Sequence, residues 1–233
     1  MVSFVKIEGE LVRGLFKERV TRFSALIKIG NEETLCFLPN PGRLNELLVK
    51  DAYLILSKKP CGRRKTVYDI VAVLHNNQLI SIDSRLPNLL VLSALKNRDL
   101  PEFAHYSKFK PEFKYGKTRF DFLLSNHGNP CILEVKSCTL VRSDIALFPD
   151  APTSRGTRHV MELAKAVKES YAAAILFIIQ RTDAKIFRPN DEIDPAFGKA
   201  LREAVNAGVK VYAYSSEFIG DKLILKSKVQ VAL

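Results

Sequence analysis

The fold is decided by two apolar runs that contain charged residues, Arg119-Phe120-Asp121-Phe122-Leu123-Leu124 and Ile132-Leu133-Glu134-Val135-Lys136-Ser137. The Asn, Gly and Pro residues between them predict a turn, and therefore an antiparallel hairpin. Side chains alternate along a strand, so Glu134 and Lys136 share one face, while Asp121 faces opposite to Phe120 and Phe122. One hairpin register therefore brings Asp121, Glu134 and Lys136 together.

Two carboxylates and a lysine at the rim of an apolar sheet are the groups that metal-dependent phosphodiester cleavage requires. Asp121 and Glu134 are expected to bind a hard divalent cation through oxygen, Mg²⁺ or Mn²⁺. Lys136 is expected to orient or deprotonate the attacking water and to offset charge on the phosphate. The alternative is a structural ion pair, in which Lys136 neutralises Glu134 or Asp121 beside a sheet edge.

The composition favours a polyanionic partner. Lys and Arg total 36 against 25 Asp and Glu, which gives a net charge of +11, a balance typical of nucleic-acid-binding proteins. The alternative to a polyanionic partner is a basic surface that is simply solvated. A chain of 233 residues with 47% hydrophobic residues can build a sizeable core, which argues against disorder. We expect a soluble, cytoplasmic protein, because no apolar run reaches transmembrane length and residues 1–6 lack the pattern of a signal peptide. The four cysteines form no Cys-x-x-Cys pair, which argues against zinc binding.

The first eighty residues are rich in short strand patterns separated by turn residues, with one short helix predicted over Gly42–Leu48. This order is compatible with an oligonucleotide-binding (OB) barrel. Basic residues in or beside its turns are candidates for phosphate contacts, although each also fits an ordinary surface charge. They are Arg22, Arg43, Arg63, Arg64 and Lys65.

The pattern changes near residue 83, which predicts an OB-like nucleic-acid-binding barrel over residues 1–82 and a second domain over residues 83–233. A helix over Ser84–Asn97 precedes a three-strand meander, and a later helix leads into the fully apolar Ala172–Ile179, a central strand. Asp194-Pro195 begins another helix. The last strand, Lys222–Leu233, is predicted either to lie at a sheet edge or to return onto the barrel. This order indicates an α/β fold, of the α+β kind.

The second domain resembles the core of the PD-(D/E)xK nuclease superfamily, with Asp121 on the second strand of the meander and Glu134-Val135-Lys136 on the third. The resemblance implies a mixed sheet flanked by helices, and Gln180 fits a polar position that supports the site. The first helix has Asn88 where many members place an acid, so Glu112 is a candidate substitute. The literal Pro149-Asp150 pair follows the Glu-x-Lys motif, which is the wrong order for a metal ligand.

Longer segments resemble the sugar fermentation stimulation protein (SfsA) family over nearly the whole chain. The resemblance implies an OB-like domain joined to a nuclease-like domain, in a protein described as DNA-binding and linked to the regulation of sugar metabolism. The matching segments are Phe37–Leu44, Arg119–Phe122, Leu133–Ser137, Phe148–Gly156, Arg158-His159 and Gln180-Arg181.

The segment between residues 137 and 156 is too long and too apolar for a simple connector, and loops of this kind are usually functional. Arg155 and Arg158 at a helix N-terminus would form a phosphate-binding corner. Asp150 fits a turn or cap residue as well as a catalytic one. His159 fits a general acid or a structural histidine.

Two hypotheses of different classes follow. The first is a Mg²⁺-dependent DNA nuclease, and the second is a non-catalytic DNA-binding regulator of sugar metabolism on a nuclease-like scaffold. RNA is a third candidate ligand. Binding is expected to depend on phosphate contacts and to weaken with salt, because no sequence-reading helix is visible. The oligomeric state stays open, a homodimer included.

Overall fold

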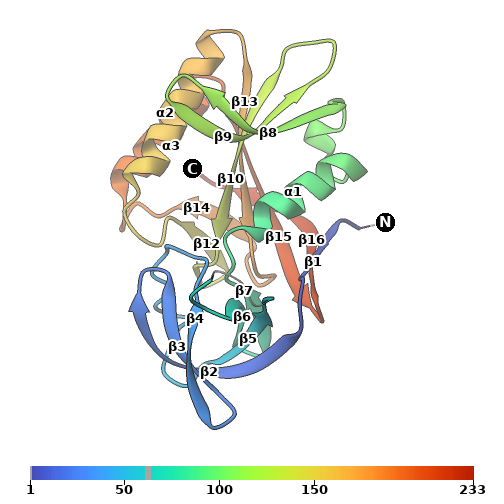
Figure 1. The fold of residues 1–233 in the computed structure, drawn as a ribbon. Coiled ribbons are helices and arrows are strands. Elements are labelled where there is room, and N and C mark those ends of the chain that lie inside the picture. Colours follow the sequence, from blue (N-terminus) through green and yellow to red (C-terminus); the bar gives the residue numbers. More distant parts are fainter. Residues whose placement is uncertain (1, 61–63) are drawn as a thin grey trace.

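The computed structural model describes residues 2–60 and 64–233, and it contains two β-sheets. The smaller sheet is built from β2 to β7, and the larger sheet from β1 and β8 to β16. Three α-helices accompany the larger sheet. Figure 1 shows the smaller sheet, in blue and cyan, packed below the larger one. Within the described residues, no helix is long and apolar enough to cross a membrane.

Five strands of the smaller sheet close into a barrel in the order β4-β3-β2-β5-β6, because Phe37 of β4 pairs with Asp69 of β6. Alternation places Ala25 and Ile27 of β3 in its buried interior. The predicted OB-like barrel is confirmed. The strands are β2 (Leu11–Thr21), β3 (Ser24–Ile29), β4 (Glu32–Phe37), β5 (Tyr53–Lys58), β6 (Tyr68–His75) and β7 (Gln78–Ser81), which extends β6 as a hairpin.

The helix predicted over Gly42–Leu48 is wrong, because this segment forms turns. Arg19 explains the difference. Its Nη1 atom donates to the carbonyl oxygens of Gly42 at 2.5 Å and of Arg43 at 3.0 Å, which a helix would need for its own hydrogen bonds. Leu44 also has a φ of +54°, outside the helical region.

The larger sheet has the strand order β11-β12-β14-β16-β15-β13-β10-β9-β8, with β1 paired to β16. At its centre β10, β13 and β15 are parallel. The strands are β1 (Phe4–Lys6), β8 (Lys108–Tyr115), β9 (Thr118–Ser125), β10 (Cys131–Cys138), β11 (Val141–Arg142), β12 (Ile145–Phe148), β13 (Ala172–Ile179), β14 (Ile186–Pro189), β15 (Lys210–Ile219) and β16 (Lys222–Val231).

The helices cover the two faces of this sheet. α1 (Leu86–Asn97) packs on one face, and α2 (Ser154–Lys168) and α3 (Pro195–Asn206) pack on the other; a short 3₁₀ helix, η1, spans Pro101–Phe103. β13 is apolar throughout because its side chains alternate between the two resulting cores, which confirms the predicted central strand. Asp194 caps α3 as predicted, since its Oδ1 accepts from the Phe197 N–H at 3.0 Å.

Two predictions about connections were wrong. β16 neither lies at an edge nor joins the barrel, since it lies between β15 and β14 with Leu223, Leu225 and Val229 buried. The segment expected to be a long loop contains the hairpin of β11 and β12, and β12 pairs in parallel with β14. These strands are too short for a sequence pattern to reveal them.

Candidate functional site

Asp121 lies where β9 and β10 separate. Their antiparallel ladder ends at the pair Leu133 and Phe122, one residue before Asp121 would face Glu134. There the Asp121 carboxylate replaces a backbone acceptor, because its Oδ2 accepts from the Val135 N–H at 2.7 Å. Its Oδ1 accepts from Asn88 Nδ2 of α1 at 2.6 Å. A strand and a helix thus hold the carboxylate at the end of the hairpin.

The regular alternation predicted around Asp121 was wrong. Phe122 packs in the core beneath α1, whereas Phe120 packs in the core beneath α2 and α3. The β8–β9 hairpin therefore turns over at this point. Glu112, which lies beside Asp121 in the strand register, has a φ of +52°, an irregular backbone that accompanies the turnover.

Glu134 is the most enclosed charged side chain of the site, at 3% exposure. Its Oε1 accepts from Lys136 Nζ and meets His159 Nδ1 at 2.6 Å. Its Oε2 is buried and has no hydrogen-bond partner among the described residues. A buried carboxylate oxygen without a donor is costly. One oxygen of Glu134 is therefore fixed by the protein, and the other is available to a ligand.

His159 reaches Glu134 from the first half of α2 and is buried. Arg155 Nε donates to His159 Nε2 at 3.4 Å, so Nε2 is the acceptor and Nδ1 carries the proton that it donates to Glu134. The ring also packs edge-on against Phe120, with 5.5 Å between centroids. These contacts fix the imidazole and, through it, the Glu134 carboxylate.

The electrostatics of the two carboxylates differ. The pKa of Asp121 is raised to about 6, first by burial and then by the negative charge of Glu134, against the opposing hydrogen bond from Val135. Burial would also raise the pKa of Glu134, but Lys136 and His159 hold it below its usual value. Near neutral pH both groups are therefore ionised in a low-dielectric place, an arrangement that attracts a cation.

Gln180 follows the buried end of β13 and lies beside the end of β10, with 0% exposure. Its Nε2 donates to Ser137 Oγ at 2.9 Å. Its Oε1 is buried and unpartnered among the described residues. Gln180 therefore supports the strand that carries Glu134 and Lys136.

Glu112 is not brought into this cluster. Its exposed carboxylate pairs with Arg119, at 3.7 Å between Oε2 and Nη1. Asn88, noted in the sequence only as the place of a missing acid, contacts Asp121 instead. No local pattern signals this contact, because Asn88 and Asp121 are 33 residues apart in the chain.

The basic candidates are spread over both sheets. Arg22 and Arg43 are exposed around the barrel, and Lys65 is exposed beyond it. Arg64 forms an ion pair with the buried Asp69. Arg63 lies outside the described residues. Arg155 and Arg158 are exposed on the first turns of α2.

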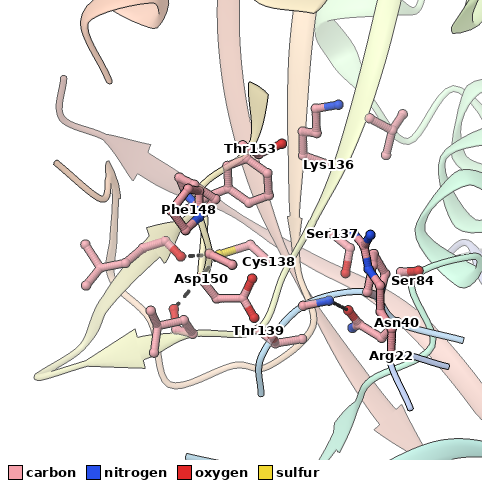
Figure 2. Close-up of a pocket in the computed structure, with 18 residues that line it drawn as sticks. Arg22, Asn40, Ser84, Lys136, Ser137, Cys138, Thr139, Phe148, Asp150 and Thr153 are labelled. Carbon is pink, nitrogen blue, oxygen red and sulfur yellow. Dashed lines mark hydrogen bonds between the residues drawn. The ribbon is translucent and has the colours of Figure 1, made fainter. Parts of the chain in front are cut away.

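A cleft of about 240 Å³ lies between the barrel and the larger sheet, directly beside Lys136. One wall comes from Arg22 and the loop Asn40-Pro41-Gly42, and the other from residues 137–140 and 147–153. Figure 2 shows Lys136 at one end of this lining and Arg22 at the other, beside Ser84 and Ser137, with Asp150 across from them. Asp150 Oδ2 accepts from the Leu44 N–H at 3.3 Å.

Metal-ligating side chains gather only in part. In the described ranges there is no group of three or more His, Cys, Asp or Glu side chains placed to hold a metal ion. The site offers two carboxylates, those of Asp121 and Glu134, with Lys136 beside them. One of their oxygens, Glu134 Oε2, has no hydrogen-bond partner among the described residues.

The fold and site define a class of protein in which a closed OB-like barrel precedes a mixed α/β sheet with an Asp and a Glu-x-Lys motif at a hairpin end. Two family profiles match successive parts of the chain. The SfsA N-terminal OB domain matches residues 18–82, and the sugar fermentation stimulation protein RE domain matches residues 85–222. The chain belongs to the sugar fermentation stimulation protein (SfsA) family.

Relatives match over almost their whole length. A sugar fermentation stimulation protein homolog of Caldanaerobacter subterraneus subsp. tengcongensis is 43% identical over 97% of this chain and 99% of its own. A homolog of Moorella thermoacetica is 45% identical over 90% of this chain and 91% of its own. The structure of Pyrococcus furiosus SfsA in complex with Ca²⁺ matches with a TM-score of 0.91 and 28% identity, covering 98% of this chain and 100% of that one.

Proposed function

We propose that this protein is a divalent-cation-dependent phosphodiesterase that binds and cuts DNA. The observation that carries the proposal is Glu134 Oε2, a buried carboxylate oxygen with no partner in the described part of the chain, next to a second carboxylate and a lysine. Structural ion pairs normally satisfy their buried oxygens, so an orphaned one favours an absent ligand.

The residues fit a hard cation. Asp121 and Glu134 would hold it through oxygen, the ligand type that Mg²⁺, Mn²⁺ and Ca²⁺ prefer. The Ca²⁺ complex of the Pyrococcus furiosus relative supports divalent-cation binding by this chain, and Mg²⁺ or Mn²⁺ is the cation we propose for activity. When bound, such a cation lowers the pKa of water and stabilises charge on the phosphate.

The other residues of the site have separate roles in this proposal. His159 keeps Glu134 Oε1 occupied, so that Oε2 faces the ligand. Lys136 Nζ holds a positive charge beside the carboxylates, where it can orient the attacking water and offset charge on the phosphate. Exposed Arg155 and Arg158 lie at the N-terminus of α2, which favours an anionic strand there.

A non-catalytic DNA-binding regulator is the second candidate. The observation in its favour is that the described residues contain no group of three metal-ligating side chains. On this alternative the net charge of +11 and the barrel supply binding, and the carboxylates only shape the site.

The two candidates are separated by a cleavage assay on labelled single-stranded DNA, duplex DNA and RNA with Mg²⁺, Mn²⁺ or EDTA over a salt series. We expect metal-dependent cutting by the native chain that is lost in Asp121→Asn and Lys136→Ala. Asp144→Asn, an exposed carboxylate paired with Lys185, is the matched control and should cut normally. Equal binding by all four proteins without cutting would establish the regulator instead.

A further inference from the structure

Several polar side chains of the cleft beside Lys136 form hydrogen bonds within the protein. Asn40 donates to the Ile82 carbonyl at 2.9 Å and accepts from the Gly42 N–H at 2.8 Å. Ser84 donates to the Pro39 carbonyl at 2.7 Å, and Ser137 accepts from Gln180. Asn40, Ser84 and Ser137 thus each use part of their hydrogen-bonding capacity to hold the walls together.

Three charged side chains line the cleft, and the Nζ of one of them, Lys136, also donates to Glu134 Oε1. Lys136 lies at one end of the cleft and Arg22 at the other (Figure 2). Asp150 forms part of the opposite wall, where its Oδ2 accepts one long hydrogen bond and its Oδ1 accepts none from the described residues. Two cations therefore bracket an acceptor-only carboxylate.

This arrangement suits one particular orientation of a nucleic-acid strand. Phosphates are attracted to Lys136 and Arg22 and repelled by Asp150. The sugar-phosphate chain would then follow the two cations, and the base would turn toward Asp150. Leu147 and Phe148 lie on the same wall as Asp150, and Pro41 lies on the facing wall; these apolar groups suit the faces of a base.

We propose that this cleft binds one unpaired nucleotide next to the scissile phosphate, with Arg22 on its far phosphate and Asp150 accepting a hydrogen bond from an amino group of its base. The inference rests on the proposed function and adds the substrate: a strand that is single-stranded at this position. The volume of about 240 Å³ is below the ~300–1,000 Å³ of pockets for drug-sized ligands, so it suits a single nucleotide and not a helix.

Cytosine carries an amino group and thymine carries none, and both are pyrimidines that stack in similar ways. The test is fluorescence anisotropy with labelled oligo(dC) and oligo(dT) of about 12 nucleotides, a length within the range bound by small barrels. All titrations contain EDTA, so binding is read without cleavage. We expect native protein to bind oligo(dC) about fivefold or more tightly than oligo(dT), since one such base contact discriminates by about this factor.

Asp150→Asn should abolish the preference without weakening the binding of oligo(dT), because the amide still accepts from Leu44 but also donates to thymine carbonyls. The matched control Asp51→Asn, an exposed carboxylate paired with Lys17 on the barrel, should keep it. Arg22→Ala should weaken the binding of both oligonucleotides alike and reduce the slope of log affinity against log salt concentration by about one. Replacing Arg13, an exposed residue of the barrel, by alanine should change the affinity much less.

Equal native affinity for the two oligonucleotides, or a preference that survives Asp150→Asn, would overturn the proposal. The cleavage assay above is independent of this result. A protein that cuts DNA but shows no preference would retain the proposed function and lose the nucleotide subsite, whereas a protein that binds neither oligonucleotide would lose both.

Discussion

Glu134 of β10 and His159 of α2 meet at 2.6 Å between Oε1 and Nδ1, although 25 residues separate them in the chain. Both side chains are buried, and the histidine ring is fixed by Arg155 and Phe120. Because His159 and Lys136 both use Oε1, the second oxygen of Glu134 is left without a partner in the described ranges. The contact therefore determines which oxygen a cation can reach.

Replacing His159 by leucine should weaken cation binding about 10- to 100-fold, the usual cost of removing a group that orients a metal ligand. Isothermal titration with Ca²⁺ measures this. Asparagine at this position places its amide N–H near the place of the His159 Nδ1–H. His159→Asn should therefore bind Ca²⁺ more tightly than His159→Leu does. Equal Ca²⁺ affinity in the native chain and in His159→Leu would show that the histidine only fills space.

Divalent cations should raise the melting temperature of the native chain, since a ligand that binds only the folded state stabilises it by about 3 kcal/mol at 100 times its Kd. Glu134→Gln should remove this shift because it removes the unpartnered carboxylate oxygen. Thermal scans with Mg²⁺, Ca²⁺ and EDTA test the expectation, with Asp144→Asn as the control. A full shift in Glu134→Gln would place the cation elsewhere.

The pH dependence of stability should change in Asp121→Asn. The pKa of Asp121 is raised from 3.8 to about 6 by burial and by Glu134, so the folded chain holds this proton more tightly than the unfolded chain. The resulting stabilisation is present below about pH 4 and is lost as the pH rises through about 6. Relative to the variant, native protein in EDTA should lose about 3 kcal/mol of unfolding free energy across this range, measured by urea unfolding. If the difference in unfolding free energy between the two proteins stayed constant over this pH range, the raised pKa of Asp121 would be contradicted.

Gly42 and Asp150 should be coupled in stability. A methyl group on Gly42 would overlap the Asp150 carboxylate, and the Gly42 backbone does not have a positive φ, so the effect is steric. Gly42→Ala should cost about 1–3 kcal/mol of unfolding free energy, as overpacking usually does. The double variant with Asp150→Ala should recover much of that loss in chemical denaturation. Additive losses would show that the two residues do not oppose each other.

The hairpin that carries the site was predictable because its information is local. The turn and the alternation in the strands fix a register that places Asp121 near Glu134 and Lys136. The detailed geometry at Asp121 was not predictable, because β9 and β10 separate there and Phe120 and Phe122 enter different cores. Strand alternation cannot anticipate a hairpin that turns over.

Contacts between distant segments account for what the sequence did not reveal. Asn88 reaches Asp121 only because α1 packs across the sheet. The turns after Asn40 replace the expected helix because Arg19, on another strand, takes the carbonyl groups. Asp150 accepts a hydrogen bond from Leu44, which lies 106 residues away in the chain. Each depends on packing that no local pattern encodes.

We propose above that Asp121 and Glu134 hold a catalytic divalent cation. The most direct measurement is the anomalous difference map of a crystal soaked with Mn²⁺. We expect a peak within about 2.5 Å of Glu134 Oε2, a typical oxygen–cation distance, that also lies next to the Asp121 carboxylate. A map with no peak there, or with its peak at another carboxylate such as Asp150, would contradict it.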